Sequence, residues 1–249
     1  MVKALPALTA LLLALPMANA VAGDKPHFVE PKLYIAKGGH AAPQVALTLD
    51  ACAGQTDMRI LNALVDNRIP ATIFVTGRWL KRNPEAVAIL QAHRDLFELE
   101  NHGLNHVPAI DNQQEMFGLK TAGSQEAIQA EIAGGALAME ASAKVKPVWY
   151  RDATARYSDD AIALIHSMGY RVAGYSLNAD MGASLMSAQV EKRITGAKDG
   201  DVIIAHINQP SRVAGAGVVK GVLALKQKGF HFVRLEDVTE SEKPVQSGV

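Results

Sequence analysis

Two kinds of hydrophobic pattern alternate along the chain from residue 45 onwards. The first is a short apolar run, rich in Val, Ile, Phe and Tyr and bounded by Gly, Pro, Asn or Asp, which is typical of a buried β-strand. The second places apolar residues three and four positions apart, which predicts an amphipathic helix. The strand-like runs lie at residues 45–50, 71–76, 97–101, 146–152, 170–178, 201–207 and 230–237.

Helical patterns fill the intervals between these runs. They lie at residues 58–67, 83–93, 124–144, 158–169, 187–198 and 215–229. Asp57 precedes the first of them, and its side chain suits the N-cap position. Strands that alternate with helices predict right-handed crossovers and a parallel sheet of the α/β class. Seven strands with six helical connections fit either a barrel one unit smaller than the eight-fold one or an open, doubly wound sheet.

Residues 1–20 differ in composition from the rest of the chain. Lys3 gives a positive start, an apolar stretch rich in Leu and Ala follows, and a small-x-small pattern ends at Ala20. This pattern is typical of a secretory signal peptide cleaved near Ala20, the alternative being a buried N-terminal helix. We therefore expect a secreted or periplasmic protein in which residues 21–249 form a single domain. No other apolar stretch reaches the length of a membrane span, about 18 residues, so we expect no stable membrane insertion.

The overall composition narrows the possible partners. Of the 249 residues, 49% are hydrophobic, which is enough for one sizeable core. The 25 basic and 25 acidic residues balance, so nothing indicates nucleic acid as a partner. The single cysteine, Cys52, cannot form an internal disulfide. In an exported protein it is a free buried thiol, a metal ligand or a reactive group.

Ionisable side chains gather where the predicted strands end. Because the C-terminal ends of parallel strands meet on one rim, α/β proteins place their chemistry on that rim. The residues at these ends are Asp50, His102, His106, Arg151, Asp180 and His206. Their coincidence predicts a functional site there.

The histidine pair within this set points to a metal. His102 and His106 are four positions apart, which places two imidazoles on one side of a turn. Two imidazoles combined with oxygen suit zinc or a similar divalent ion. The plainer interpretation is two surface histidines on a loop.

The other residues of the set each have a catalytic and a structural interpretation. Asp50 fits a general base beside a metal-bound water, or a cap for the loop that follows its strand. His206 ends an otherwise apolar run, so it fits a general acid or a satisfied core histidine. Arg151 orients Asp50, or forms a structural ion pair with Asp152.

The order of these residues resembles the motifs of the polysaccharide deacetylase family, the NodB-homology group that includes chitin and peptidoglycan deacetylases. The segments that carry the resemblance fall within residues 43–238. They are "LTLDACAG", "IPATIFVTGRWL", "HGLNH", "YRDAT", "SLNAD", "IIAH" and "LKQKGFHFVRLEDV". The resemblance implies a distorted (β/α)7 barrel and a metal-dependent hydrolase that removes an N-acyl group from a sugar.

The resemblance also implies a role for each residue. His102 and His106 would bind a divalent metal, and zinc is the ion that these ligands suit best. Asp50 would be the catalytic base, oriented by Arg151. His206 would be the acid that protonates the leaving amine, and Asp180 would tune it. The expected partner is a glycan or an N-acyl amino sugar.

The first motif departs from the family pattern at one position. Where the family has a second aspartate that binds the metal, this chain has Ala51. A catalytic zinc usually has three protein ligands and a water. We predict that Asp50 supplies the third ligand here, with Cys52, Asp57 or no third ligand as the alternatives.

Two further hypotheses follow from the positions at which this chain differs from the family motifs. The loss of a ligand at Ala51 fits a non-catalytic glycan-binding protein that keeps the barrel. Residues 152–154 lack the family's proline-containing turn, and no Trp follows Asp180, so the usual sugar cannot be assumed. That difference fits a small-molecule amidase or deformylase. The leading hypothesis remains an exported hydrolase that removes an acetyl or other N-acyl group from an envelope glycan.

Overall fold

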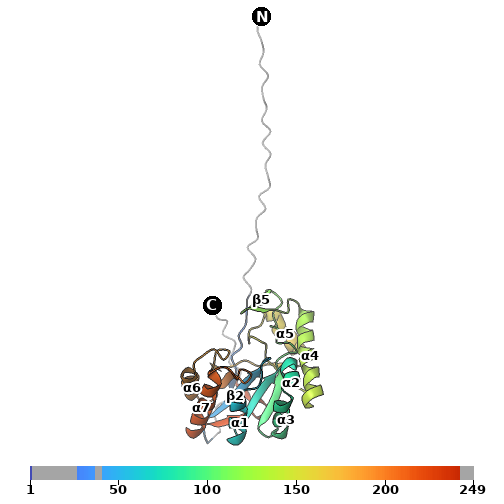
Figure 1. The fold of residues 1–249 in the computed structure, drawn as a ribbon. Helices are drawn as coiled ribbons and strands as arrows, with labels where there is room; N and C mark the ends of the chain where they lie inside the picture. The colour runs from blue at the N-terminus through green and yellow to red at the C-terminus, as the bar shows by residue number, and fades with distance from the viewer. Residues whose placement is uncertain (2–26, 37–40, 242–249) are drawn as a thin grey trace.

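A curled, parallel β-sheet forms the centre of the molecule, and helices lie around its outside (Figure 1). The computed structural model describes Met1 and residues 27–36 and 41–241, so the predicted signal peptide, apart from Met1, lies outside the described residues. The strand order is β8-β7-β4-β3-β2-β10-β9, and β11 pairs with the start of β2. This arrangement confirms the predicted α/β fold, a distorted (β/α)7 barrel.

The strands of this sheet are short and follow most of the predicted runs. Their bounds are Gln44–Ala51 (β2), Ala71–Val75 (β3), Phe97–Asn101 (β4), Trp149–Tyr150 (β7), Arg171–Val172 (β8), Leu177–Asn178 (β9), Val202–His206 (β10) and His231–Val233 (β11). Two small antiparallel pairs lie outside it: Tyr34–Ile35 (β1) with Glu240–Ser241 (β12), and Glu115–Met116 (β5) with Leu119–Lys120 (β6).

The helices confirm all six predicted helical segments and add one. Their bounds are Met58–Asp66 (α1), Gly77–Arg82 (α2), Pro84–Ala92 (α3), Gln125–Ala143 (α4), Asp159–Ser167 (α5), Ser187–Thr195 (α6) and Ala214–Gln227 (α7), with a 3₁₀ turn at Leu235–Asp237. Asp57 caps α1 as predicted, accepting a hydrogen bond from the backbone N–H of Arg59. Helix α2 is too short to show a helical period in the sequence, and it begins where the Thr76 side chain caps it. No helix within the described ranges is long and apolar enough to cross a membrane.

The prediction of one strand over residues 170–178 is wrong, because this segment forms two strands. Strand β8 pairs with β7 at one edge of the sheet, and β9 pairs with β10 at the other edge. Only residues 173–176 separate them, and five Cα steps span at most about 18 Å. The two edges must therefore lie close together, which is how the sheet closes on itself.

Strand β2 shows how the sheet sorts its side chains. Leu47, Leu49 and Ala51 belong to the core cluster that also contains the apolar residues of α1, α3, α6 and α7. Thr48 and Asp50 point to the opposite face, where both contact the guanidinium of Arg151. The alternation of a strand thus directs Asp50 into the barrel and places its neighbours in the outer core.

Candidate functional site

The predicted site residues all lie at the C-terminal ends of the parallel strands or in the loops that follow them. Asp50 is the penultimate residue of β2 and His206 the last residue of β10, and the two are partners in register. His102 and Arg151 come directly after β4 and β7, and Asp180 follows β9 by two residues. The fold therefore brings together groups that are far apart in the sequence.

Asp50 is held by a buried arginine. Arg151 Nη1 donates to Asp50 Oδ1 at 2.8 Å and to Thr48 Oγ1 at 2.9 Å. The guanidinium also stacks over the ring of Phe74 at 4.1 Å, and Nη2 donates to the carbonyl oxygen of Gly174. Burial alone would raise the pKa of Asp50, but Arg151 and the nearby histidines lower it below its ordinary value. Asp50 is thus an oriented, ionised carboxylate.

His206 is held by a buried carboxylate. Its Nδ1 lies 3.0 Å from Asp180 Oδ1, and its backbone N–H donates to Asp180 Oδ2 at 2.7 Å. Burial alone would lower the pKa of His206, but the charge of Asp180 and its hydrogen bond raise it well above the ordinary value. The Nδ1–H···Oδ1 contact fixes the ring and leaves Nε2 to act on a ligand.

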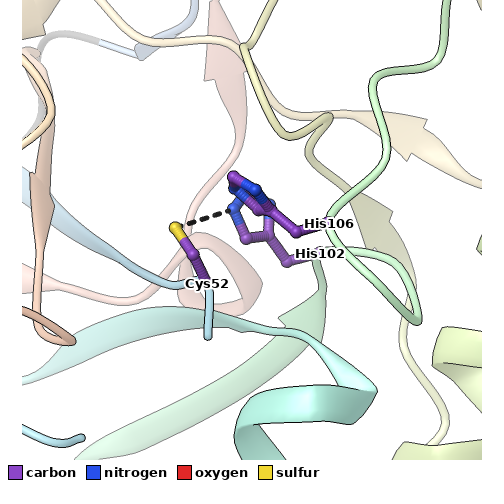
Figure 2. Close-up of side chains that lie close together, drawn as sticks. All are labelled: Cys52, His102 and His106. Atoms are coloured by element: carbon purple, nitrogen blue, oxygen red, sulfur yellow. Dashed lines mark hydrogen bonds between the residues drawn. The ribbon is translucent and has the colours of Figure 1, made fainter. Parts of the chain in front are cut away.

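Three side chains converge beside this pair: Cys52, His102 and His106 (Figure 2). Their donor atoms all lie within 4.8 Å of one another, and Cys52 Sγ is 3.6 Å from His102 Nε2. His102 Nδ1 is 2.8 Å from the carbonyl oxygen of Arg151, which can only accept, so Nδ1 carries a proton and the neutral form of the ring has its lone pair on Nε2. His106 Nε2 is buried and has no hydrogen-bond partner within the described part of the chain.

The residues of this cluster fit a divalent metal. Sulfur and nitrogen ligands of a tetrahedral zinc are separated by about 3.5 Å, close to the 3.6 Å between Cys52 Sγ and His102 Nε2. A metal bound at this place would also give a partner to the buried Nε2 of His106, which otherwise has none in the described part of the chain. Asp50 Oδ2 lies 3.8 Å from His102 Nε2 and stands outside the cluster, and its predicted role as a ligand stays a prediction.

Asp57, an alternative third ligand in the sequence, is engaged elsewhere. Its Oδ1 accepts from the backbone N–H and the Nε of Arg59, and its Oδ2 accepts from Arg59 Nη2. It caps α1 and lies outside the Cys-His-His cluster.

Glu131 shapes the loop between the two histidines, although the sequence analysis did not single it out. Its Oε1 accepts from the backbone N–H groups of Asn105 and Val107, which flank His106. His106 itself has a φ of 65°, an uncommon conformation for a residue other than glycine. A charge on the same face of α4 as Ile128 and Ile132 is the signal that marks Glu131 in the sequence.

A pocket of about 640 Å³ opens beside Asp50 and His206. Asp50 and His206 both line it, together with residues that follow β7 and β9. Glu30 lines it as well, and its carboxylate accepts from the hydroxyl of Tyr175 at 2.6 Å and from Arg156 Nε at 3.3 Å. Residues 153–156 also line the pocket, and they overlap the segment 152–154 that lacks the family's proline-containing turn. The lining mixes charged and hydroxyl-bearing side chains with apolar ones such as Phe117 and Met181.

Asp152 has a structural environment, in contrast to its neighbour Arg151. Its Oδ1 accepts from the backbone N–H of Ala109, and its Oδ2 accepts from the backbone N–H and the hydroxyl of Thr154. Burial raises the pKa of Asp152 despite these bonds. Arg151 pairs with Asp50, while Asp152 ties two loops together.

Comparison with known proteins gives a consistent result. The family model described as polysaccharide deacetylase matches residues 37–173, more than half of the chain. The match includes Asp50, His102, His106 and Arg151 and ends before His206. A search of curated protein sequences finds no significant match.

Solved structures share the fold at low sequence identity. The peptidoglycan N-acetylglucosamine deacetylase Bc1960 aligns with a TM-score of 0.68 at 17% identity, covering 84% of this chain and 92% of that one. Bacillus subtilis PdaA, a family 4 carbohydrate esterase, aligns with a TM-score of 0.65 at 18% identity, covering 83% and 84%. BA3943 from Bacillus anthracis, a CE4 family pseudoenzyme, aligns with a TM-score of 0.62 at 18% identity, covering 80% and 66%.

Proposed function

Because the chain belongs to the polysaccharide deacetylase family, we propose that it is an exported, metal-dependent hydrolase that removes an N-acyl group from an amino sugar of an envelope glycan. One observation carries the proposal. Asp50 and His206, a carboxylate and an imidazole with opposite pKa shifts, are register partners and line the same pocket. A base and an acid side by side are what hydrolysis of an amide requires.

Asp50 is the base in this mechanism. When bound by His102, His106 and a third side chain, a divalent metal would polarise the acyl carbonyl and make water more acidic. Asp50 takes the proton of the attacking water, and Arg151 holds its carboxylate in position and ionised. Because Arg151 is itself fixed by Thr48 and Gly174, the base is preorganised.

His206 is the acid. A C–N bond breaks only when the departing nitrogen gains a proton, since an amide anion is a poor leaving group. Asp180 keeps His206 protonated near neutral pH and holds the ring through Nδ1, so that Nε2 can deliver the proton. The transfer leaves a neutral imidazole and a free amine on the sugar.

Substrate class and location rest on three supports. The signal-peptide pattern of residues 1–20 favours export, where an envelope glycan is the accessible substrate. One structural neighbour, Bc1960, is described as a peptidoglycan N-acetylglucosamine deacetylase. The pocket beside Asp50 and His206, with its mixed polar and apolar lining, is compatible with a sugar ring.

Acetate release tests the proposal. The purified chain, loaded with zinc, is incubated with peptidoglycan and with N-acetylglucosamine oligomers, and acetate is measured before and after chelation. We expect chelator-sensitive release that His102→Ala abolishes. Glycan binding without turnover and insensitive to chelator would instead support a pseudoenzyme like BA3943. Turnover of short N-acyl amines but not of glycans would support a small-molecule amidase.

Export is tested separately. N-terminal sequencing of the protein recovered outside the cytoplasm of its native host should begin just after Ala20. Recovery only from the cytoplasm, with Met1 retained, would contradict export without affecting the proposed chemistry.

A further inference from the structure

We propose that the thiolate of Cys52 is the third protein ligand of the metal site, which makes the site Cys-His-His. The inference deepens the proposed function at the same site. The starting observation is the cluster in Figure 2, where Cys52 from the segment after β2 and His102 and His106 from the loop after β4 point toward one another. Within the described residues this is the group of His, Cys and carboxylate side chains whose geometry suits a metal.

Several independent contacts hold the three side chains of this cluster in place, so it is more than a chance contact of one cysteine. The Nε2 atom of His106 is buried without a hydrogen-bond partner in the described part of the chain, and such an atom calls for a ligand. The Nε2 atom of His102 faces Cys52 Sγ because its Nδ1 is committed to the carbonyl of Arg151. The cysteine is also anchored, since its own carbonyl oxygen accepts from the hydroxyl of Thr76.

Asp50 is committed to a different partner. Its Oδ1 atom accepts from Arg151, whose side chain is fully buried. Its other oxygen, Oδ2, lies 3.8 Å from His102 Nε2 but does not belong to the group whose donor atoms all lie within 4.8 Å of one another. Bringing Oδ2 into that group would require the carboxylate to turn, which would weaken its buried hydrogen bond to Arg151. With Cys52 as ligand, Asp50 stays beside Arg151 and remains free to act as the base.

The alternation of β2 explains why the cysteine can do this. Thr48 and Asp50 point into the barrel interior, and Cys52, the residue directly after the strand, continues on the same side, because its Sγ lies 3.6 Å from His102 Nε2. Ala51 faces the outer core. The ligand has therefore moved one residue along the chain relative to the family motif and changed from a carboxylate to a thiolate.

A thiolate changes which metals the site prefers. Sulfur and imidazole ligands favour zinc and cobalt, whereas carboxylate ligands favour harder ions such as manganese and magnesium. We expect this chain to select zinc strongly over manganese. The replacement Cys52→Asp should keep metal binding while shifting the preference toward manganese.

Cobalt substitution tests the proposal directly on the full chain. A thiolate bound to Co²⁺ gives an intense near-ultraviolet charge-transfer absorption, and Cys52 is the one cysteine in the sequence. The metal-free wild-type protein should develop this absorption with one equivalent of Co²⁺. Cys52→Ala should lack it and bind zinc at least about 100-fold more weakly. Asp50→Asn is the matched control and should retain both the absorption and the zinc affinity.

The result that overturns the proposal is a wild-type cobalt complex without the charge-transfer absorption, or no cobalt binding at all. Because this reading comes from the wild-type protein, it does not depend on whether a variant folds. Zinc should also protect Cys52 from alkylation by iodoacetamide, and equal labelling with and without zinc would contradict the assignment. If the thiolate–cobalt absorption appeared but no N-acyl substrate were hydrolysed, the proposed function would be wrong and the Cys-His-His metal site would still be supported.

Discussion

Asp50 and His206 are register partners on the neighbouring parallel strands β2 and β10. Adjacent strands lie about 4.8 Å apart, so the base and the acid of the proposed reaction are separated by a single strand spacing. Each is held by a buried partner of opposite charge, Arg151 for Asp50 and Asp180 for His206. The sheet itself therefore sets the distance between the proposed base and the proposed acid.

Asp50→Asn should remove the base while leaving the metal in place. We expect kcat to fall by about 10²- to 10⁴-fold, with a zinc content equal to that of the wild type. The buried Arg151 loses its counter-charge, so the free energy of unfolding should also fall, by about 3–5 kcal/mol. Acetate release, metal analysis and denaturant unfolding measure the three effects. Loss of zinc together with activity would show that Asp50 is a ligand.

Asp180→Asn should move the alkaline limb of the pH–rate profile to lower pH. His206 must be protonated to act, so activity is lost as the pH rises through its pKa. Burial lowers this pKa, whereas Asp180 and, to a smaller extent, Cys52 raise it, so removing the charge of Asp180 should lower the pKa of His206. kcat against pH is the measurement.

The exposed Asp160→Asn provides the control for this shift. Its profile should match the wild type. A uniform loss of kcat in Asp180→Asn, with the alkaline limb unmoved, would mean that Asp180 positions His206 without tuning its pKa.

Glu100→Gln should make stability less dependent on pH. Burial and the neighbouring Glu98 raise the pKa of Glu100 to about 9, from an ordinary value of 4.5. Between these values the folded protein holds a proton that the unfolded chain releases, so stability falls as the pH rises. The slope is at most about 1.4 kcal/mol per pH unit. Denaturant unfolding at several pH values measures it.

The substitution suits its site because the Oε2 of Glu100 accepts backbone N–H bonds from Val148 and Trp149, which a glutamine oxygen also accepts. A smaller slope should remain, since the pKa of Glu98 is raised as well. Replacing the exposed Glu85 by Gln should change nothing. If the free energy of unfolding of Glu100→Gln depended on pH as steeply as that of the wild type, the proton taken up on folding would be bound by another group.

Ala51→Asp, which restores the family aspartate, should destabilise the protein and not strengthen metal binding. Ala51 is fully buried, pairs with Val75 and lies in the outer core. An unpaired carboxylate there should cost about 3 kcal/mol or more. Ala51→Asn separates the effect of charge from that of volume. Wild-type stability with tighter zinc binding would contradict the orientation described for this residue.

The topology and the location of the site could be predicted from the sequence for a physical reason. Alternating strands and helices admit few connections, and parallel strands collect their C-terminal residues on one rim. Asp50, His102, Arg151 and His206 were therefore assigned to one place without knowledge of their distances. The sequence left Arg151 with two possible partners, Asp50 and Asp152, and only the structure shows that it pairs with Asp50.

The finer features depend on contacts that no local pattern encodes. The segment from β8 to β9 has strand-like composition throughout, yet it changes partners midway because the sheet closes there. The position of Cys52 was ambiguous because strand alternation is reliable only while the strand lasts, and β2 ends one residue before it. Glu131 acts through backbone N–H groups in a distant loop.

The break between β8 and β9 also has a chemical use. Where strand pairing is interrupted, the carbonyl oxygens of Ala173 and Gly174 are turned toward Arg151 and accept from its Nε and Nη2. In a continuous strand, such carbonyl oxygens would accept hydrogen bonds from the neighbouring strands instead. The break that lets the barrel close thus also supplies the hydrogen-bond acceptors that hold the guanidinium of Arg151. A redesign that made residues 171–178 one continuous strand would remove these acceptors and loosen the arginine that positions Asp50.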